Sequence, residues 1–123
     1  MLSPATWEDL EAWVPASGLS RLPGHTWLAY KAPGFLSLFV QGNGTWESHW
    51  WSTSSAFASL TACRESLKMF FKDSKAQSVL GLTECENKRG LKMARLLGYK
   101  PLGFQRTLEG KMALLSIKEN LDG

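Results

Sequence analysis

The run Gly42-Asn43-Gly44 constrains the fold of this chain more than any other short segment. Glycine and asparagine both tolerate the positive φ angles that the central positions of a tight hairpin turn require. A β-prone stretch flanks the run on each side, FLSLFVQ at residues 35–41 and TWESHWWS at residues 45–52. We therefore predict an antiparallel β-hairpin in the first half of the chain.

A third β-prone stretch, HTWLAYKA at residues 25–32, precedes this hairpin and is separated from it by the turn signal Pro33-Gly34. The three stretches together predict an antiparallel meander. In a strand over residues 45–52, alternation places Trp46 and Trp50 on one face, where we expect them to lie in the core. The opposite face then carries Glu47, His49 and Trp51.

A long helix and a buried strand should follow the meander. The run STSS at residues 52–55 offers N-cap side chains for a helix over residues 56–71, which has apolar residues at helical spacing. Residues 78–83, SVLGLT, are short and apolar like a buried strand. Since a strand, a helix and a second strand form a right-handed crossover, the two strands should be parallel.

Helices are also expected near each end of the chain. Ser3 can cap a first helix with Pro4 at its first position, which leaves too few residues before it for a strand. A last helix is predicted over residues 86–97, with Gly98 as its left-handed C-terminal cap, and a final hairpin over residues 99–106 and 111–117. The sequence therefore predicts one α+β domain over residues 1–123. Its mixed sheet has about six strands, an antiparallel meander plus a parallel βαβ step, with helices on both faces.

Composition excludes several classes of protein. The chain has 123 residues, 44% hydrophobic and 20% charged, which suits a single domain with a buried core. No apolar run approaches the ~20 residues that span a membrane, and the N-terminus does not read as a signal peptide. The two cysteines, Cys63 and Cys85, form no CxxC pair and the two histidines lie far apart. We expect free thiols, no metal site, and a location in a reducing compartment such as the cytoplasm.

The segment ECENKRGLKMARLLGYKPLGF at residues 84–104 resembles a signature of the GNAT (Gcn5-related N-acetyltransferase) superfamily. Asn87 matches the asparagine of that signature, Gly98 its glycine and Tyr99 the aromatic residue after it. The motif covers about 20 residues of the chain, whereas the expected topology matches over residues 25–117. The resemblance implies a GNAT-like fold, binding of an acyl-CoA and transfer of the acyl group to an amine.

This resemblance also reveals departures at the expected cofactor site. GNAT enzymes hold the pyrophosphate of CoA at a glycine-rich loop before the long helix, a place taken here by STSS without glycine or a basic residue. Serine hydroxyls and helix N–H groups could still hold an anion, although N-capping is the favoured interpretation. The cofactor-binding candidates are therefore Ser52, Thr53, Ser54, Ser55 and Asn87.

The expected catalytic groups also depart from the family. Many members use a tyrosine on the last helix to protonate the leaving thiolate, but Ala94 stands at that place, and neither Tyr30 nor Tyr99 does. Glu47 and His49 are candidates for a general base, because family members often carry a glutamate near this strand. An ordinary solvent-exposed strand face is the favoured reading of this pair.

Charge divides the chain into two unlike parts. Residues 1–51 contain two basic and four acidic side chains, whereas residues 52–123 contain twelve basic and seven acidic ones. The basic part of the chain could bind an anionic ligand such as a nucleic acid. We instead interpret its basic side chains as residues on solvent-exposed helix faces. The cations considered for nucleic-acid binding are Lys88, Arg89, Lys92 and Arg95.

The departures lead us to expect a non-catalytic GNAT-fold protein without a cofactor. It would be similar to small proteins of tailed bacteriophages and act as a virion or assembly component through contacts with other proteins. Exposed tryptophans are common anchors at such contacts, and the candidates are Trp7, Trp13 and Trp51. The alternative is an acetyl-CoA-dependent N-acetyltransferase with a divergent active site.

Overall fold

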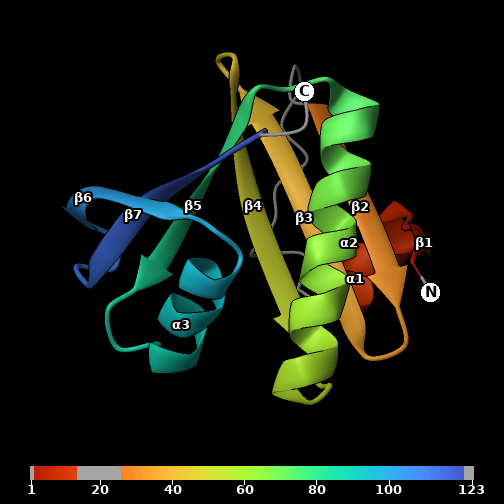
Figure 1. Cartoon of the computed structure of the whole chain (residues 1–123), viewed down its shortest axis with the longest axis horizontal. Coiled ribbons are helices and arrows are strands. Elements are labelled where there is room, and N and C mark those ends of the chain that lie inside the picture. The colour runs from red at the N-terminus through yellow and green to blue at the C-terminus, as the bar shows by residue number, and fades with distance from the viewer. Residues whose placement is uncertain (1, 14–25, 121–123) are drawn as a thin grey trace.

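The computed structural model describes residues 2–13 and 26–120, in which a mixed sheet of seven strands packs against three helices (Figure 1). The strand order is β1-β2-β3-β4-β5-β7-β6. The expected end of the first helix, the loop after it and His25 lie outside the described residues. The elements are β1 (Ser3–Pro4), α1 (Trp7–Trp13), β2 (Thr26–Ala32), β3 (Phe35–Gly42), β4 (Thr45–Ser52), α2 (Ala56–Ser74), β5 (Ser78–Glu84), α3 (Lys88–Leu96), β6 (Lys100–Arg106) and β7 (Met112–Glu119).

The predicted meander, parallel step and final hairpin are confirmed. Strands β2, β3 and β4 pair antiparallel, and Asn43 and Gly44 adopt the positive φ angles expected at the turn, 54° and 79°. β4 and β5 are the parallel pair, joined by α2. β7 pairs antiparallel with both β5 and β6. The meander β1 to β4 therefore lies on one side of the β4–β5 pair, and β7 and β6 lie on the other.

The expectation that the chain starts with a helix at Ser3 is wrong. Ser3 and Pro4 form a short edge strand that pairs with Lys31 and Tyr30 of β2, which gives seven strands rather than about six. Proline is tolerated there because an edge strand needs only half of its backbone groups for pairing. The next residue, Ala5, donates its N–H to the Ala29 carbonyl at 2.9 Å, and the helix begins only after this contact.

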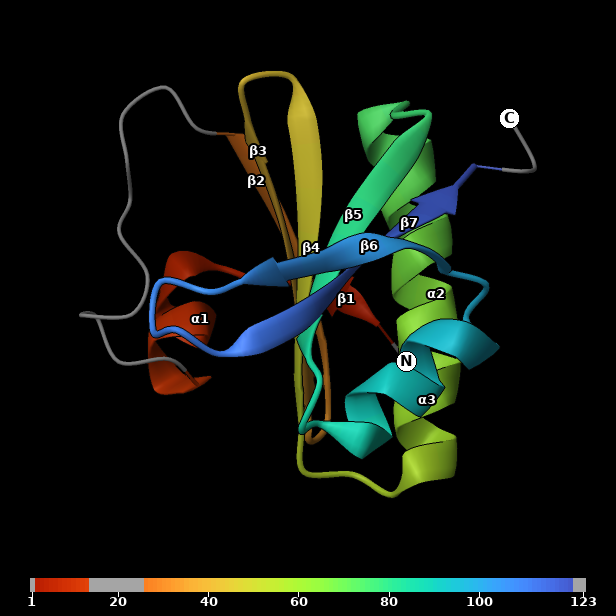
Figure 2. The same cartoon turned by 90° about the vertical axis from the view of Figure 1, so that its left-hand side faces the viewer.

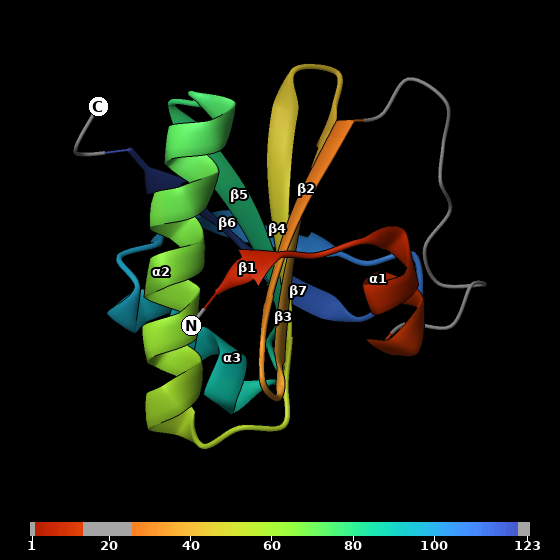
Figure 3. The ribbon, with the colours of Figure 1, turned by 90° about the vertical axis from the view of Figure 1, so that its right-hand side faces the viewer.

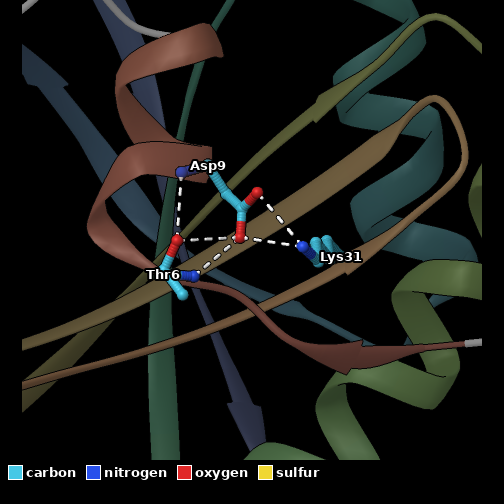
Figure 4. Close-up of polar contacts among 3 residues, drawn as sticks. All are labelled: Thr6, Asp9 and Lys31. Carbon is cyan, nitrogen blue, oxygen red and sulfur yellow. Dashed lines mark hydrogen bonds and ion pairs between the residues drawn. The ribbon is translucent and has the colours of Figure 1, made fainter.

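Helix α1 starts at a reciprocal cap between Thr6 and Asp9 (Figure 4). The Asp9 carboxylate accepts from the Thr6 N–H at 2.8 Å, and the Thr6 hydroxyl accepts from the Asp9 N–H at 3.3 Å. Lys31 of β2 donates to the same carboxylate at 3.1 Å. The Thr6 N–H and Lys31 both lower the pKa of Asp9, so this carboxylate is charged and joins α1 to the sheet.

The helices lie on both faces of the sheet, as predicted: α2 and α3 cover one face and α1 the other (Figures 2 and 3). The main core lies beneath α2, where Phe39 of β3 and Phe70 of α2 stack with ring centroids 4.2 Å apart. Trp46 is buried in this core and Trp50 packs against it, which confirms the predicted alternation along β4. Within the described residues no helix is both long and apolar enough to cross a membrane.

A smaller core lies beneath α1 and is built around Leu10, Ala29, Leu36 and Leu38. The three tryptophans proposed from the sequence as partner contacts all pack against it. Each is partly buried, so each contributes to the fold of this layer as well as to its surface. These three residues are Trp7, Trp13 and Trp51.

Candidate functional site

The parallel strands β4 and β5 pair over only two positions and then separate. Glu47 is opposite Leu80 and Ser48 is opposite Gly81, and the parallel ladder ends there. A cavity of about 420 Å³ opens beyond this point, between the carboxyl ends of the two strands and α3. Trp50 and Trp51 line this cavity but do not fill it. Space for a ligand therefore remains between the two strands. We call this cavity the cleft.

The cleft is lined by residues from both faces of the sheet. Its lining includes Trp50 and Met93, which lie on the side of α2 and α3. It also includes His49 and Trp51, which point to the other face because side chains alternate along β4. The gap between the strands therefore brings side chains of both faces to a single cavity.

Arg89 brings a positive charge to the start of α2, although the loop before that helix contains no basic residue. Its Nη2 atom donates to the Ser54 carbonyl at 3.2 Å and to the Ser59 hydroxyl at 3.5 Å. Arg89 also lines a second cavity of about 220 Å³ that shares Trp50 and Asn87 with the cleft. Helical spacing alone predicts that Arg89 lies on a solvated face of α3. The contact with α2 could not be predicted in this way, because the spacing does not show that α3 packs next to the first turn of α2.

The serine-rich loop is largely used for local structure. Ser55 is the N-cap of α2 and accepts from the Ala58 N–H at 3.2 Å, as the favoured interpretation held. The Ser52 and Ser59 hydroxyls are 2.7 Å apart, and the Thr53 N–H donates to the Gly34 carbonyl. Among the four residues of this loop, residues 52–55, only Ser52 lines the second cavity.

Asn87 and Gly90 form a close pair at the start of α3. Asn87 is the N-cap and its side-chain oxygen accepts from the Gly90 N–H at 2.9 Å. A Cβ atom at Gly90 would lie 2.5 Å from the Asn87 side-chain nitrogen and 3.0 Å from the Thr83 methyl group. Glycine is thus needed at this helical position for close approach. Both residues line both cavities, so α3 presents its first turn to the site.

Tyr99 places a hydroxyl in the cleft from a position other than the one at which family members carry their catalytic tyrosine. Ala94 lines the cleft as expected, but Tyr99 reaches it from the residue after the Gly98 turn, and its hydroxyl is 2.9 Å from that of Ser48. Ser48 donates its proton to the Leu80 carbonyl at 2.9 Å, so the Tyr99 proton is directed at Ser48. Burial raises the pKa of Tyr99, which keeps this phenol protonated.

His49 and Glu47 lie together on the α1 side of the sheet. The His49 Nε2 atom is 4.0 Å from the Glu47 carboxylate, and the imidazole stacks on Trp51 at an interplanar angle of 18°. Partial burial lowers the pKa of His49, and Glu47 opposes this shift. Of this pair only His49 lines the cleft. Within the described residues, no group of three or more histidines, cysteines or acidic residues could hold a metal ion.

We compared the chain with protein families, curated proteins and solved structures. No family model matches the chain, and no curated protein matches it. Among solved structures, the ribosomal-protein-S18-alanine N-acetyltransferase of Escherichia coli is similar, with a TM-score of 0.66 and 12% identity over 97% of this chain and 92% of that one. A GNAT-family acetyltransferase from Bacillus anthracis gives 0.62 and 16% over 76% of this chain and 65% of that one.

A third similar structure contains the cofactor. The aminoglycoside acetyltransferase AAC(6')-Ib in complex with coenzyme A has a TM-score of 0.62 and 12% identity, over 76% of this chain and 66% of that one. This chain therefore spans about two thirds of the length of some of these neighbours. At such low identity the likeness shows the fold alone, and the fold is the GNAT fold that the sequence predicted.

The expectation of a non-catalytic phage component is contradicted by these findings. The structures named above are acetyltransferases, and none is a phage protein. The expectation treated the missing glycines and the alanine at position 94 as loss of function. The structure instead has an open cleft, with an arginine and a tyrosine reaching the site from other positions. The alternative, an acetyltransferase, agrees better with the comparisons.

Proposed function

We propose that this protein is an acyl-CoA-dependent N-acyltransferase with acetyl-CoA as its acyl donor. The observation that carries the proposal is the cleft, which opens where β4 and β5 separate and is lined by residues from both faces of the sheet. The coenzyme A complex of the aminoglycoside acetyltransferase, which shares this fold, also supports the choice of donor.

The residues at the start of α2, next to the second cavity, suit the charged part of this donor. The first N–H groups of α2, at Ala56 and Phe57, precede the first intrahelical hydrogen bond and attract anions. Arg89 adds a full positive charge beside them. These N–H groups and the guanidinium are hydrogen-bond donors that would suit a phosphate group. The second cavity, which Arg89 lines, contains polar and aromatic side chains. When bound, acetyl-CoA would supply the acetyl group as an activated thioester.

His49 would act as the general base for the acceptor amine. Its pKa is lowered, so the imidazole is neutral at pH 7 and can accept a proton at a ring nitrogen. It lies on the face opposite α2, which separates the amine entrance from the phosphate site. The nearby Glu47 carboxylate would stabilise the imidazolium ion that forms.

Tyr99 would act as the proton donor to the leaving thiolate. Its hydroxyl lies in the cleft, carries its proton and has Ser48 as its partner. The tyrosine that family members place on the last helix would thus be replaced by one that comes from just after it. A phenol is suitable here because its raised pKa keeps it protonated at pH 7, where the lowered pKa of His49 leaves the imidazole neutral.

Release of free CoA thiol from acetyl-CoA would test this function directly. The protein would be assayed with a panel of primary amines that includes polyamines, an aminoglycoside and a peptide with a free N-terminus. We expect amine-dependent thiol release, reduced at least about 100-fold in the variant His49→Ala. Thiol release that is the same with and without every amine, in wild type and variant, would overturn the proposal.

A further inference from the structure

A groove of about 680 Å³ lies between the second half of α2 and the end of β7. Figures 2 and 3 show these two segments side by side, away from the first turn of α2. The groove shares no lining residue with the cleft or with the second cavity. It is therefore a separate feature of the surface, which the proposed acyl transfer does not use.

The groove is strongly basic. Five cationic side chains line it, against a single carboxylate, that of Glu119. None of the ion pairs among the described residues involves these five cations. Their charges are therefore not neutralised within the described part of the chain. The five cations are Arg64, Lys68, Lys72, Lys75 and Lys118.

Most of these cations form a row along α2. Arg64, Lys68 and Lys72 occur at four-residue spacing, which places them on one side of the helix with a rise of about 6 Å between neighbours. Lys75 continues the row as the C-cap. Lysines at a helix C-terminus also suit the helix dipole, but Arg64 lies in mid-helix and Lys118 comes from β7. The row is longer than one phosphate group needs.

The remaining lining of the groove includes an aromatic ring. Leu67 and Leu97 are buried, whereas Phe71 is only partly buried and keeps part of its ring accessible. A row of cations beside an accessible aromatic ring is the combination that binds single-stranded nucleic acid, since the cations follow the phosphates and the ring stacks on a base. An acidic peptide would use the cations but would have less use for the ring.

We propose that this groove binds a single-stranded segment of nucleic acid through its phosphate backbone and one stacked base. The sequence argument against nucleic acid considered the cations on α3, and this site uses different residues on another face. The proposal does not depend on the acyltransferase function, since it can be tested without acyl-CoA.

Fluorescence anisotropy of a labelled 12-nucleotide oligouridylate would test the proposal. We expect binding at 50 mM salt that weakens as salt rises, with a log–log slope of about −3 for four to five neutralised phosphates. The double variant Lys68→Gln/Lys72→Gln should lower the magnitude of this slope by about 1.4. Phe71→Leu should keep the slope and weaken binding about tenfold, by the loss of stacking.

A matched control removes the same charge elsewhere. The double variant Lys88→Gln/Lys92→Gln alters exposed cations of α3 that do not line the groove, and it should bind like the wild type. Circular dichroism would confirm that each variant is folded. The proposal is overturned if the wild type does not bind, if both double variants weaken binding equally, or if an oligoglutamate peptide displaces the RNA at equal charge.

Discussion

The hydroxyl groups of Tyr99 and Ser48 lie 2.9 Å apart at the point where β4 and β5 stop pairing. Ser48 is the last residue of β4 in the parallel ladder, and Tyr99 follows the turn at the end of α3. The contact therefore joins β4 to the segment that follows α3, and both residues line the cleft. It holds in the cleft the phenol that we propose as the proton donor.

Replacing Tyr99 by phenylalanine tests this role. Tyr99→Phe should lower kcat for acyl transfer about 100-fold, because the proton donor is lost, and leave acetyl-CoA affinity unchanged. It should cost about 1 kcal/mol of stability through the lost hydrogen bond. Steady-state kinetics and urea denaturation would measure both effects.

Tyr30→Phe is the matched control for this variant. Tyr30 is also buried and donates a hydrogen bond, to Asp73 at 2.7 Å, but it does not line the cleft. It should show a similar loss of stability with unchanged kcat. Equal effects of the two variants on kcat would mean that Tyr99 acts only through folding.

Arg89 should contribute to the binding of acyl-CoA. Arg89→Gln removes the charge next to the first turn of α2 and should weaken acetyl-CoA binding about tenfold, the loss of one charge-assisted hydrogen bond. Arg95→Gln, in the last turn of the same helix, should bind like the wild type. Calorimetric titration of both variants with acetyl-CoA would compare their affinities. Equal affinities would show that Arg89 does not contribute to acetyl-CoA binding.

The pH dependence should report His49. Its folded pKa lies below the ordinary 6.5, so kcat/KM should rise with pH through a midpoint below 6.5 and then level off. The same shift stabilises the fold at pH values above about 6.5, and this stability is lost as pH falls through the folded pKa. In His49→Gln both dependences should disappear. A midpoint above 6.5 would contradict the assignment.

Gly90 should resist substitution despite its helical position. Gly90→Ala would ordinarily stabilise a helix by up to about 1 kcal/mol, but here the new methyl group collides with the Asn87 side chain. We expect a loss of about 1 kcal/mol in the wild type and a smaller loss in the Asn87→Ala background, where only the 3.0 Å contact with the Thr83 methyl group remains. Urea denaturation of the wild type, the two single variants and the double variant would measure the four free energies of this double-mutant cycle. A stabilised single variant would show that Asn87 moves freely.

Much of the fold could be predicted because its elements carry local signals. The Gly42-Asn43-Gly44 turn, the capped helix α2 and the alternation along β4 are each encoded within a few residues. The short strand β1 was missed because two residues carry no periodicity. Ser3 and Pro4 form a strand only because the edge of β2 is available for pairing.

The site was harder to predict because its groups come together across long separations. Helical spacing predicts a solvated Arg89, and Tyr99 matches the aromatic residue of the signature but not the place of the catalytic tyrosine. The contacts of both residues depend on how α3 and the segment after it pack against α2 and β4, which no local pattern describes. That His49 lies beside Glu47 could be predicted, because strand alternation alone places both on one face.

Binding of acetyl-CoA is the measurement that tests the account most directly. Calorimetric titration of the wild-type protein should give one site, and binding should weaken in the variant Arg89→Gln. A matching rise in melting temperature is expected for the wild type. No heat and no thermal shift with millimolar acetyl-CoA would contradict the proposal that this GNAT fold is an acyltransferase.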